Sequence, residues 1–264
     1  MKKIFSFIFC AALLALPLVS CQGVHTDWDE YLNQPDPEPE PSPDTLSGAN
    51  KALALYFTGT WCTYCPNMSK TLKAVNEKLD GRLIIVSIHK GDRYSLGFED
   101  DFCKEFSVSS FPSAIFNFEP TVFTNNEDII CEAVSRHLEE VKNPCQISAV
   151  NDPDVPGTVN VSVEIRESGK YRIFAALMQD GLVGYQVGQG DDYVSDNVIR
   201  ELATSPYGDE LDAGDGGRTI SAGTTVSWTG AAGYEDFQDC YWTLAVLKED
   251  SDGRYVVNNA VRMN

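Results

Sequence analysis

Between residues 49 and 143, apolar runs of strand length alternate with amphipathic stretches of helical period. The expected strands lie at 51–58, 82–89 and 111–118, and the expected helices at 66–79, 98–106 and 127–141. Gly81 ends the first helix, and acidic residues in the first turn of the last helix favour its start. This alternation predicts an α/β layer with parallel strand pairing.

After residue 143 the pattern changes to apolar residues at every second position, which is typical of strands with one buried face. The expected strands lie at 158–166, 171–179, 218–228, 240–249 and 255–261. Ser168-Gly169 is predicted to turn the first pair into a hairpin, and Asp252-Gly253 to turn the last pair. Residues 144–264 are therefore predicted to form an all-β, Ig-like antiparallel sandwich.

The first 48 residues carry export and anchoring signals. Residues 1–20 are typical of a secretory signal peptide, because two lysines precede an apolar stretch that is too short to span a bilayer. The ending Leu-Val-Ser-Cys resembles a bacterial lipobox with Cys21 as the lipidated residue; ordinary signal cleavage is the alternative. Residues 21–48 contain alternating prolines and acids and are expected to form an extended spacer. We expect a lipid-anchored protein of the cell envelope, in the outer membrane or at the cell surface.

The formal net charge of −19 limits the choice of partner. Loss of the two signal-peptide lysines would take it to about −21, which argues against binding to nucleic acid or to anionic lipid. No P-loop and no GxGxxG motif follows a strand, so no nucleotide is expected and no cofactor is assigned.

The stretch WCTYC (61–65) carries the candidate chemistry. Cys62 and Cys65 lie where the first strand should give way to a helix, and a helix N-terminus favours a thiolate. Three interpretations are open: a redox-active dithiol, half of a zinc site, or a structural disulfide. The chain has three histidines and no second CxxC, so we assign no metal site. Four more cysteines, expected to be structural, allow three pairings: Cys103, Cys131, Cys145 and Cys240.

CxxC at a strand–helix junction, followed by Phe111-Pro112, resembles the thioredoxin fold in the order and spacing of residues 49–143. The resemblance implies an α/β thioredoxin-like domain, followed here by the β-sandwich. It also implies that Cys62 is the attacking thiol, Cys65 the resolving thiol and Pro112 a cis proline facing them, with Phe111 before it and Trp61 beside the pair. The chain departs from the pattern at Tyr56, where thioredoxins often have a buried acid, and at Thr63-Tyr64 between the cysteines.

A second resemblance covers nearly the whole mature chain. The lipobox together with FTGTWCTYCP, SIHKGD, YRIFAALMQDGLVGYQ and YVSDNVIRELATSPYGDEL resembles the 28-kDa outer-membrane protein family of Gram-negative lipoproteins. That family implies an envelope location and a thioredoxin-like domain before a β-rich one. Its members often carry histidines where this chain has Ser195 and Asp196, so no role of those histidines is carried over.

Two functions follow as hypotheses. The first is thiol–disulfide exchange with extracytoplasmic protein thiols and disulfides through Cys62, Cys65 and Pro112. His89, at the end of the second expected strand, is a candidate for tuning a nearby thiolate; a loop histidine with satisfied hydrogen bonds is the alternative. The second hypothesis is a surface binding or adhesion lipoprotein in which the CxxC forms only a structural disulfide.

Overall fold

The computed structural model describes residues 49–214, 219–234 and 239–263 of the 264-residue chain. They belong to a compact unit that runs from Pro41 to Asn264. The expected signal peptide, the lipidated Cys21 and the spacer lie outside the described residues. No helix within the described ranges is long and apolar enough to cross a membrane.

The local elements expected between residues 49 and 143 are confirmed to within a few residues. In the described ranges the helices are α2 (Cys65–Lys78), α3 (Glu99–Glu105) and α4 (Glu127–Glu140). The strands are β1 (Ala52–Thr58), β2 (Leu83–His89), β3 (Ser113–Phe116), β4 (Val122–Phe123), β5 (Gln146–Asn151), β6 (Thr158–Glu164), β7 (Tyr171–Gln179), β8 (Leu182–Gln186), β9 (Gly190–Ser195), β10 (Val198–Leu202), β11 (Asp209–Glu210), β12 (Thr225–Ala231), β13 (Cys240–Glu249) and β14 (Tyr255–Arg262).

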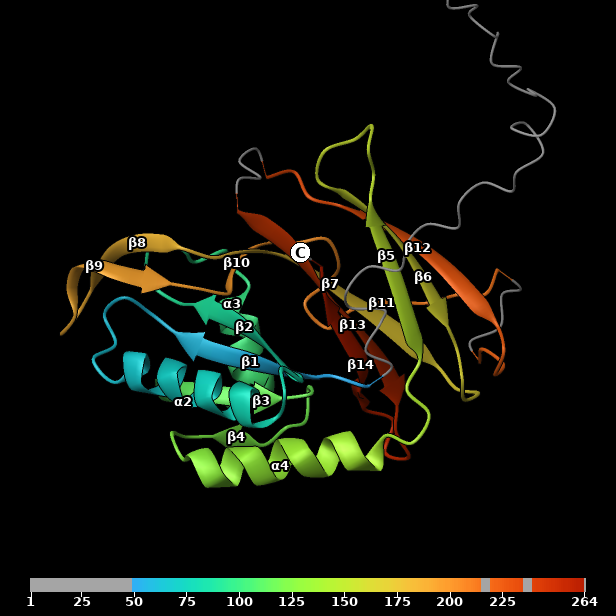
Figure 1. The fold of residues 1–264 in the computed structure, drawn as a ribbon, viewed down its shortest axis with the longest axis horizontal. Helices are drawn as coiled ribbons and strands as arrows, with labels where there is room; N and C mark the ends of the chain where they lie inside the picture. Colours follow the sequence, from blue (N-terminus) through green and yellow to red (C-terminus); the bar gives the residue numbers. More distant parts are fainter. Residues whose placement is uncertain (1–48, 215–218, 235–238, 264) are drawn as a thin grey trace, which may run out of the picture. The chain divides into compact units, whose positions relative to one another are not determined.

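Strands from both predicted domains join in one large mixed sheet (Figure 1). Its order is β14-β13-β7-β10-β2-β1-β3-β4, with β11 also paired to β7. The expected parallel pairing of β1 with β2 is confirmed over its whole length, from Ala52 opposite Leu83 to Thr58 opposite His89. Strand β3 lies on the other side of β1 and runs antiparallel to it.

The predicted fold class, an α/β thioredoxin-like domain followed by a separate sandwich, is therefore wrong. The described chain is mostly β, and strand β10 connects the two predicted regions. It pairs antiparallel with β7 on one side and parallel with β2 on the other, where Val198 lies opposite Ser87. The Ser87 N–H donates to the Asn197 carbonyl at 2.7 Å, so the sheet runs from one region into the other. The boundaries drawn at residues 20, 48 and 143 remain predictions.

The hairpin expected across Ser168-Gly169 is also wrong. Strand β6 pairs with β5 and β12 in a separate three-stranded sheet, whereas β7 pairs with β13, β10 and β11. Apolar residues at alternate positions in β6 fit a strand with one buried face, but β7 is buried along nearly its whole length because both of its faces are covered. The hairpin of β13 and β14 is confirmed, and Gly253 in its turn has a φ of 80°.

Three apolar cores explain why the sheet is continuous. On one face, side chains from β1, β2 and α3 pack with Phe174, Ala176 and Met178 of β7. On the other face, α2 and α4 cover β1, β2 and β3, while the three-stranded sheet covers β7 and β13 (Figure 1). A sandwich-like pair of layers is thus present, but one of its sheets is shared with the α/β part.

Candidate functional site

The two cysteines of the WCTYC stretch form a disulfide at the start of α2. Their Cα atoms are 5.4 Å apart, and the Cys62 N–H donates to the Gly59 carbonyl at 3.0 Å. Pro66 lies in the first turn of α2, where a missing N–H disrupts no helical hydrogen bond. A Cβ atom at Gly59 would lie 2.6 Å from the Trp61 indole nitrogen, so only glycine fits this close approach. The described residues contain no cluster of three or more His, Cys, Asp or Glu side chains that could hold a metal ion.

Both half-cystines are buried beneath exposed aromatic residues. Cys62 is 4% exposed and Cys65 is 1% exposed, while the neighbouring Trp61 and Tyr64 are 49% and 70% exposed. The Trp61 indole donates to the Lys90 carbonyl at 2.7 Å, and its ring lies 5.3 Å from the Phe111 ring. The peptide bond before Pro112 is cis. The structure therefore brings the segment at 111–112 beside the disulfide loop, which we define as residues 59–64.

Tyr56 stands at the position where thioredoxins often have a buried acid. Its hydroxyl donates to the Cys65 carbonyl at 2.6 Å, and burial raises the pKa of its phenol above the ordinary value. The phenol is therefore neutral at physiological pH, and it holds the first turn of α2 in place.

Replacing Tyr56 with phenylalanine is expected to lower the free energy of unfolding by about 1 kcal/mol, or somewhat more, because a buried carbonyl then lacks its donor. Urea denaturation of the oxidised protein would measure this. Tyr64→Phe is the matched control, because Tyr64 is mostly exposed and should give no change. Equal losses in the two variants would mean that the hydrogen bond to Cys65 is not the cause.

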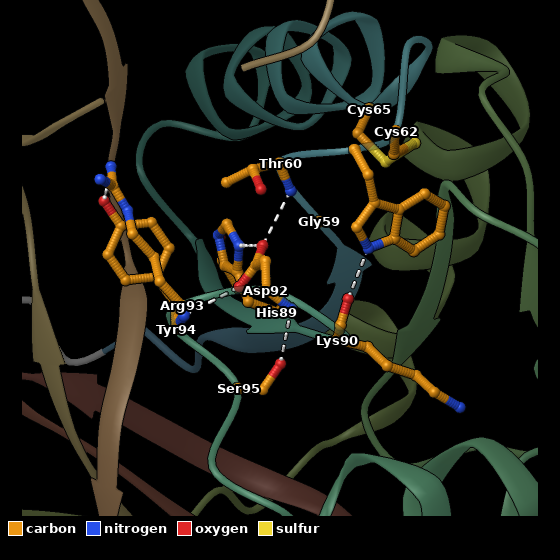
Figure 2. Close-up of polar contacts among 12 residues, drawn as sticks. Gly59, Thr60, Cys62, Cys65, His89, Lys90, Asp92, Arg93, Tyr94 and Ser95 are labelled. Atoms are coloured by element: carbon orange, nitrogen blue, oxygen red, sulfur yellow. Dashed lines mark hydrogen bonds and ion pairs between the residues drawn. A yellow bond between two sulfur atoms is a disulfide. The ribbon is translucent and has the colours of Figure 1, made fainter. Parts of the chain in front are cut away.

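His89 is buried in a pair with Asp92, a residue that the sequence patterns did not single out. The His89 Nδ1 atom lies 2.7 Å from an Asp92 carboxylate oxygen, and both side chains are 4% exposed. Asp92 also accepts from the N–H groups of Thr60 and Tyr94, each at 2.8 Å (Figure 2). Burial alone would raise the pKa of Asp92, but its hydrogen bonds with His89, Tyr94 and Thr60 together hold that pKa below its usual value. Asp92 thus ties the disulfide loop to the end of β2.

The β8–β9 hairpin packs on the disulfide loop. Neither the hairpin nor this contact was predicted from the sequence. The Gln186 side chain donates to the Cys62 carbonyl at 2.8 Å, and the Val187 N–H donates to the Thr60 carbonyl at 2.9 Å. Gly188 and Gly190, both with positive φ, turn the hairpin. The glycine-rich YQVGQGDD stretch was the available signal for the turn, but no periodicity indicated where the hairpin would dock.

A small polar cavity of about 20 Å³ lies behind the disulfide. This volume is enough for a single water molecule. The cavity is lined by side chains from α2, from the ends of β1 and β2, and from the β8–β9 hairpin and the residue after it: Tyr56, Thr58, Cys65, Pro66, Ser69, Ser87, His89, Gln186, Tyr193, Ser195 and Asp196. The only histidine of the cavity and the inner cysteine therefore face the same space.

Exposed apolar side chains gather on the disulfide loop and the hairpin. Among the described residues, nine large apolar side chains are exposed, and five of them belong to these two segments. They are Trp61, Tyr64, Val183, Tyr185 and Val194, and we call them the loop–hairpin surface. Val183 and Val194 lie opposite each other in the hairpin. An exposed apolar patch is typical of an interaction site, whereas single exposed apolar residues are ordinary. The hydrogen bonds of Gln186 and Val187 hold the two segments that carry these five residues next to each other.

A larger groove of about 700 Å³ lies elsewhere, between the end of α4 and the turn of β13 and β14. Its ionic groups are largely paired with one another, as in Lys248 with Glu167 and Arg254 with Asp250. His137 is buried there, with its Nδ1 atom 3.3 Å from a Glu119 carboxylate oxygen. These pairs leave no cluster of like charge that would define a ligand, so we place the candidate site at the disulfide.

The other cysteines are less suited to chemistry. Cys103, Cys131 and Cys145 form no disulfide with any described residue. Burial raises the pKa of Cys145 to about 12 and also raises that of Cys103, so both thiols stay protonated at neutral pH.

Comparisons with known proteins bear on the fold alone. No protein-family model and no curated protein sequence matches the chain. HBP35 of Porphyromonas gingivalis has a similar solved structure, with a TM-score of 0.64 and 15% identity over 82% of this chain and 75% of that one. A protein of Agrobacterium tumefaciens solved by a structural genomics consortium has a TM-score of 0.61 and 13% identity, over 82% of this chain and 95% of that one. The chain therefore shares its overall fold with these two bacterial proteins.

Proposed function

We propose that the protein is a binding protein that engages a protein partner through the loop–hairpin surface, with Cys62–Cys65 as a structural bridge. The observation that carries this proposal is the gathering of exposed apolar side chains on two segments that are hydrogen-bonded to each other. Aromatic residues such as Trp61 and Tyr185 are the types that most often anchor protein interfaces. The buried disulfide and Gln186 hold these anchors in place before a partner arrives, which lowers the entropy cost of binding.

Site-specific photo-crosslinking in the producing cells would test this proposal. A photoreactive amino acid is placed at Tyr64 or Tyr185, and at Val150 or Ile129 as matched controls, which are exposed apolar residues outside the surface. We expect the first two positions to give adducts of the same size, absent from the controls. Equal adducts from all four positions, or none from Tyr64 and Tyr185, would contradict the proposal.

The structural role of the disulfide makes a separate prediction. The double substitution Cys62→Ser with Cys65→Ser is expected to keep the crosslinked adducts while lowering the free energy of unfolding by about 2 kcal/mol, as chain entropy predicts for so short a loop. Urea denaturation and adduct yield would be measured on the same variant. Complete loss of adducts from a variant that is still folded would mean that the sulfur atoms themselves take part in binding.

A second candidate function is thiol–disulfide exchange with protein thiols and disulfides outside the cytoplasm. The specific observation that favours it is the position of the bridge at the N-terminus of a 14-residue helix, with Phe111 packed beside Trp61. A helix N-terminus favours the thiolate that exchange requires. A redox titration of the full mature chain, read from the alkylation of the peptide that contains Cys62 and Cys65, would decide between the two candidate functions. A midpoint between about −120 and −270 mV is typical of exchange catalysts, and one below about −300 mV is typical of structural bridges.

We also propose that the folded unit is held at the cell envelope by a lipid on Cys21, as in the 28-kDa outer-membrane protein family that the sequence resembles. The proposal is supported by the lipobox-like ending of residues 1–20 and by the Pro- and acid-rich spacer that follows. Cys21→Ser is expected to release the protein from the membrane fraction and to abolish labelling by a radioactive fatty acid. Unchanged fractionation would argue against the anchor.

A further inference from the structure

We propose that His89 transfers the proton to and from the Cys65 sulfur during exchange at the Cys62–Cys65 pair, through one water molecule in the small cavity, and that Asp92 is its positioning residue. This inference rests on the second candidate function, thiol–disulfide exchange. Strand β1 has Tyr56, and no carboxylate, at the position from which an acid could exchange a proton with the Cys65 sulfur. The inference assigns this proton transfer to His89, positioned by Asp92.

The chemistry of the bridge requires a proton at a buried atom. A thiolate of a partner dithiol attacks the Cys62 sulfur, the disulfide bond breaks, and its electron pair leaves on the Cys65 sulfur. Cys65 is 1% exposed, and burial disfavours a charged thiolate. Protonation of that sulfur makes it a better leaving group. The second partner thiol then displaces Cys62 and gives up its proton, so that one disulfide and one dithiol have exchanged two electrons and two protons.

The small cavity provides the path for the proton. It is lined by both Cys65 and His89, and its volume of about 20 Å³ accommodates one water molecule. Such a water needs two to four polar partners, and Thr58, Ser87 and Gln186 also line the cavity. A water held there would lie between the His89 and Cys65 residues, which both line the cavity.

The hydrogen bonds of Asp92 set the orientation of the imidazole. Because Asp92 remains ionised, the His89 Nδ1 atom carries a proton and donates it to the carboxylate at 2.7 Å. The Nε2 atom is then the one that can donate to, or accept from, the water. The same carboxylate oxygen that contacts His89 accepts the Thr60 N–H, which fixes the histidine relative to the disulfide loop.

The other titratable groups around the cavity are poorer candidates. Tyr56 and Tyr193 are phenols, whose ordinary pKa is about 10, and burial raises the pKa of Tyr56 further. Asp196 forms an ion pair with Lys73 at 2.8 Å and accepts from the Gly181 N–H. Burial would raise the pKa of Asp196, but these contacts hold it below the usual value, so the carboxylate stays ionised. Histidine is the side chain whose ordinary pKa lies near neutrality.

The test is the rate at which dithiothreitol reduces the full mature chain, measured between pH 5.5 and 8.5 by alkylation of Cys62 and Cys65. His89→Asn is expected to slow reduction about 100-fold near neutral pH, the low end of the range for general acid catalysis, and to flatten the pH profile. Asp92→Asn should shift the profile with a smaller loss of rate. His137→Asn is the matched control, because His137 is also buried with its Nδ1 atom near a carboxylate, that of Glu119, but lies in the larger groove.

The reduction rates test the role of His89 separately from thiol–disulfide exchange itself. A slowed and flattened profile in His89→Asn, with the His137→Asn profile unchanged and both variants folded by near-UV circular dichroism, supports the proposal. A wild-type pair that is reduced readily, with the same rate and profile in His89→Asn, overturns the proposal but leaves exchange standing. A wild-type pair that dithiothreitol does not reduce at any of these pH values overturns both.

Discussion

Replacing Phe174 with alanine is expected to destabilise both predicted regions at once, by about 3–5 kcal/mol. Phe174 is buried in β7, and its ring lies 5.5 Å from that of Phe118, which belongs to the region before residue 143. The same core contains Leu53 and Phe57 of β1. The cavity left by the Phe174 ring would lie between the two regions. The loss of stability should therefore not be confined to the strands after residue 143. Hydrogen exchange in urea would show lower protection in β1 and β2 as well as in β7 and β13.

The matched control is Val150→Ala, because Val150 lies in β5 with its side chain largely exposed and should change stability by no more than about 0.5 kcal/mol. A result in which Phe174→Ala lowers protection in β7 and β13 alone, with β1 and β2 unchanged, would mean that two independent domains fold side by side. That outcome would restore the division predicted from the sequence.

Replacing Asp92 with alanine is expected to cost about 3–5 kcal/mol, because it leaves His89 and two backbone N–H groups buried without their acceptor. The conservative variant Asp92→Asn isolates the charge and gives a pH dependence whose sign follows from the lowered pKa. An acid with a lower pKa in the folded state stabilises the protein above its unfolded pKa of about 3.9, and this contribution is lost as the pH falls through the folded value.

The contribution of the Asp92 charge to the stability difference between wild type and Asp92→Asn should therefore be fully present above about pH 4 and shrink below it. Urea midpoints between pH 2.5 and 7 would measure it. Asp191→Asn, at an exposed acid on the hairpin, is the control and should show no such trend. A difference that stays constant down to pH 2.5 would mean that the charge of Asp92 does not contribute to stability.

Local elements could be predicted from the sequence because their signals are local. The burial of β1 and β2 and the amphipathic face of α2 are visible as apolar runs and helical spacing. The partners of each strand could not be predicted, because the same alternation fits any antiparallel neighbour. Val198 and Ser87, which pair in the sheet, are more than a hundred residues apart in the sequence. No pattern within β10 or β2 indicates this pairing.

The same limit applies to the candidate site. The spacing of Cys62 and Cys65 predicted that they lie close together. The resemblance to the thioredoxin fold predicted that Trp61 and Phe111 lie beside them. Asp92 and Gln186 were missed because each is an ordinary polar residue in a loop or short strand, and its role depends on which carbonyl or N–H group lies nearby in the fold. Sequence periodicity contains no information on such contacts.

The shared core has a consequence for the order in which the protein is made. Residues 49–143 leave the ribosome before residues 144–264, yet one face of β1 and β2 packs against side chains of β7, β10 and β13, which are made only later. Until then an apolar sheet face and the outer edge of β2 are open, and both favour aggregation. An export route that keeps the chain unfolded until all of it has been released would avoid this, because the two halves of the sheet would then meet at the same moment.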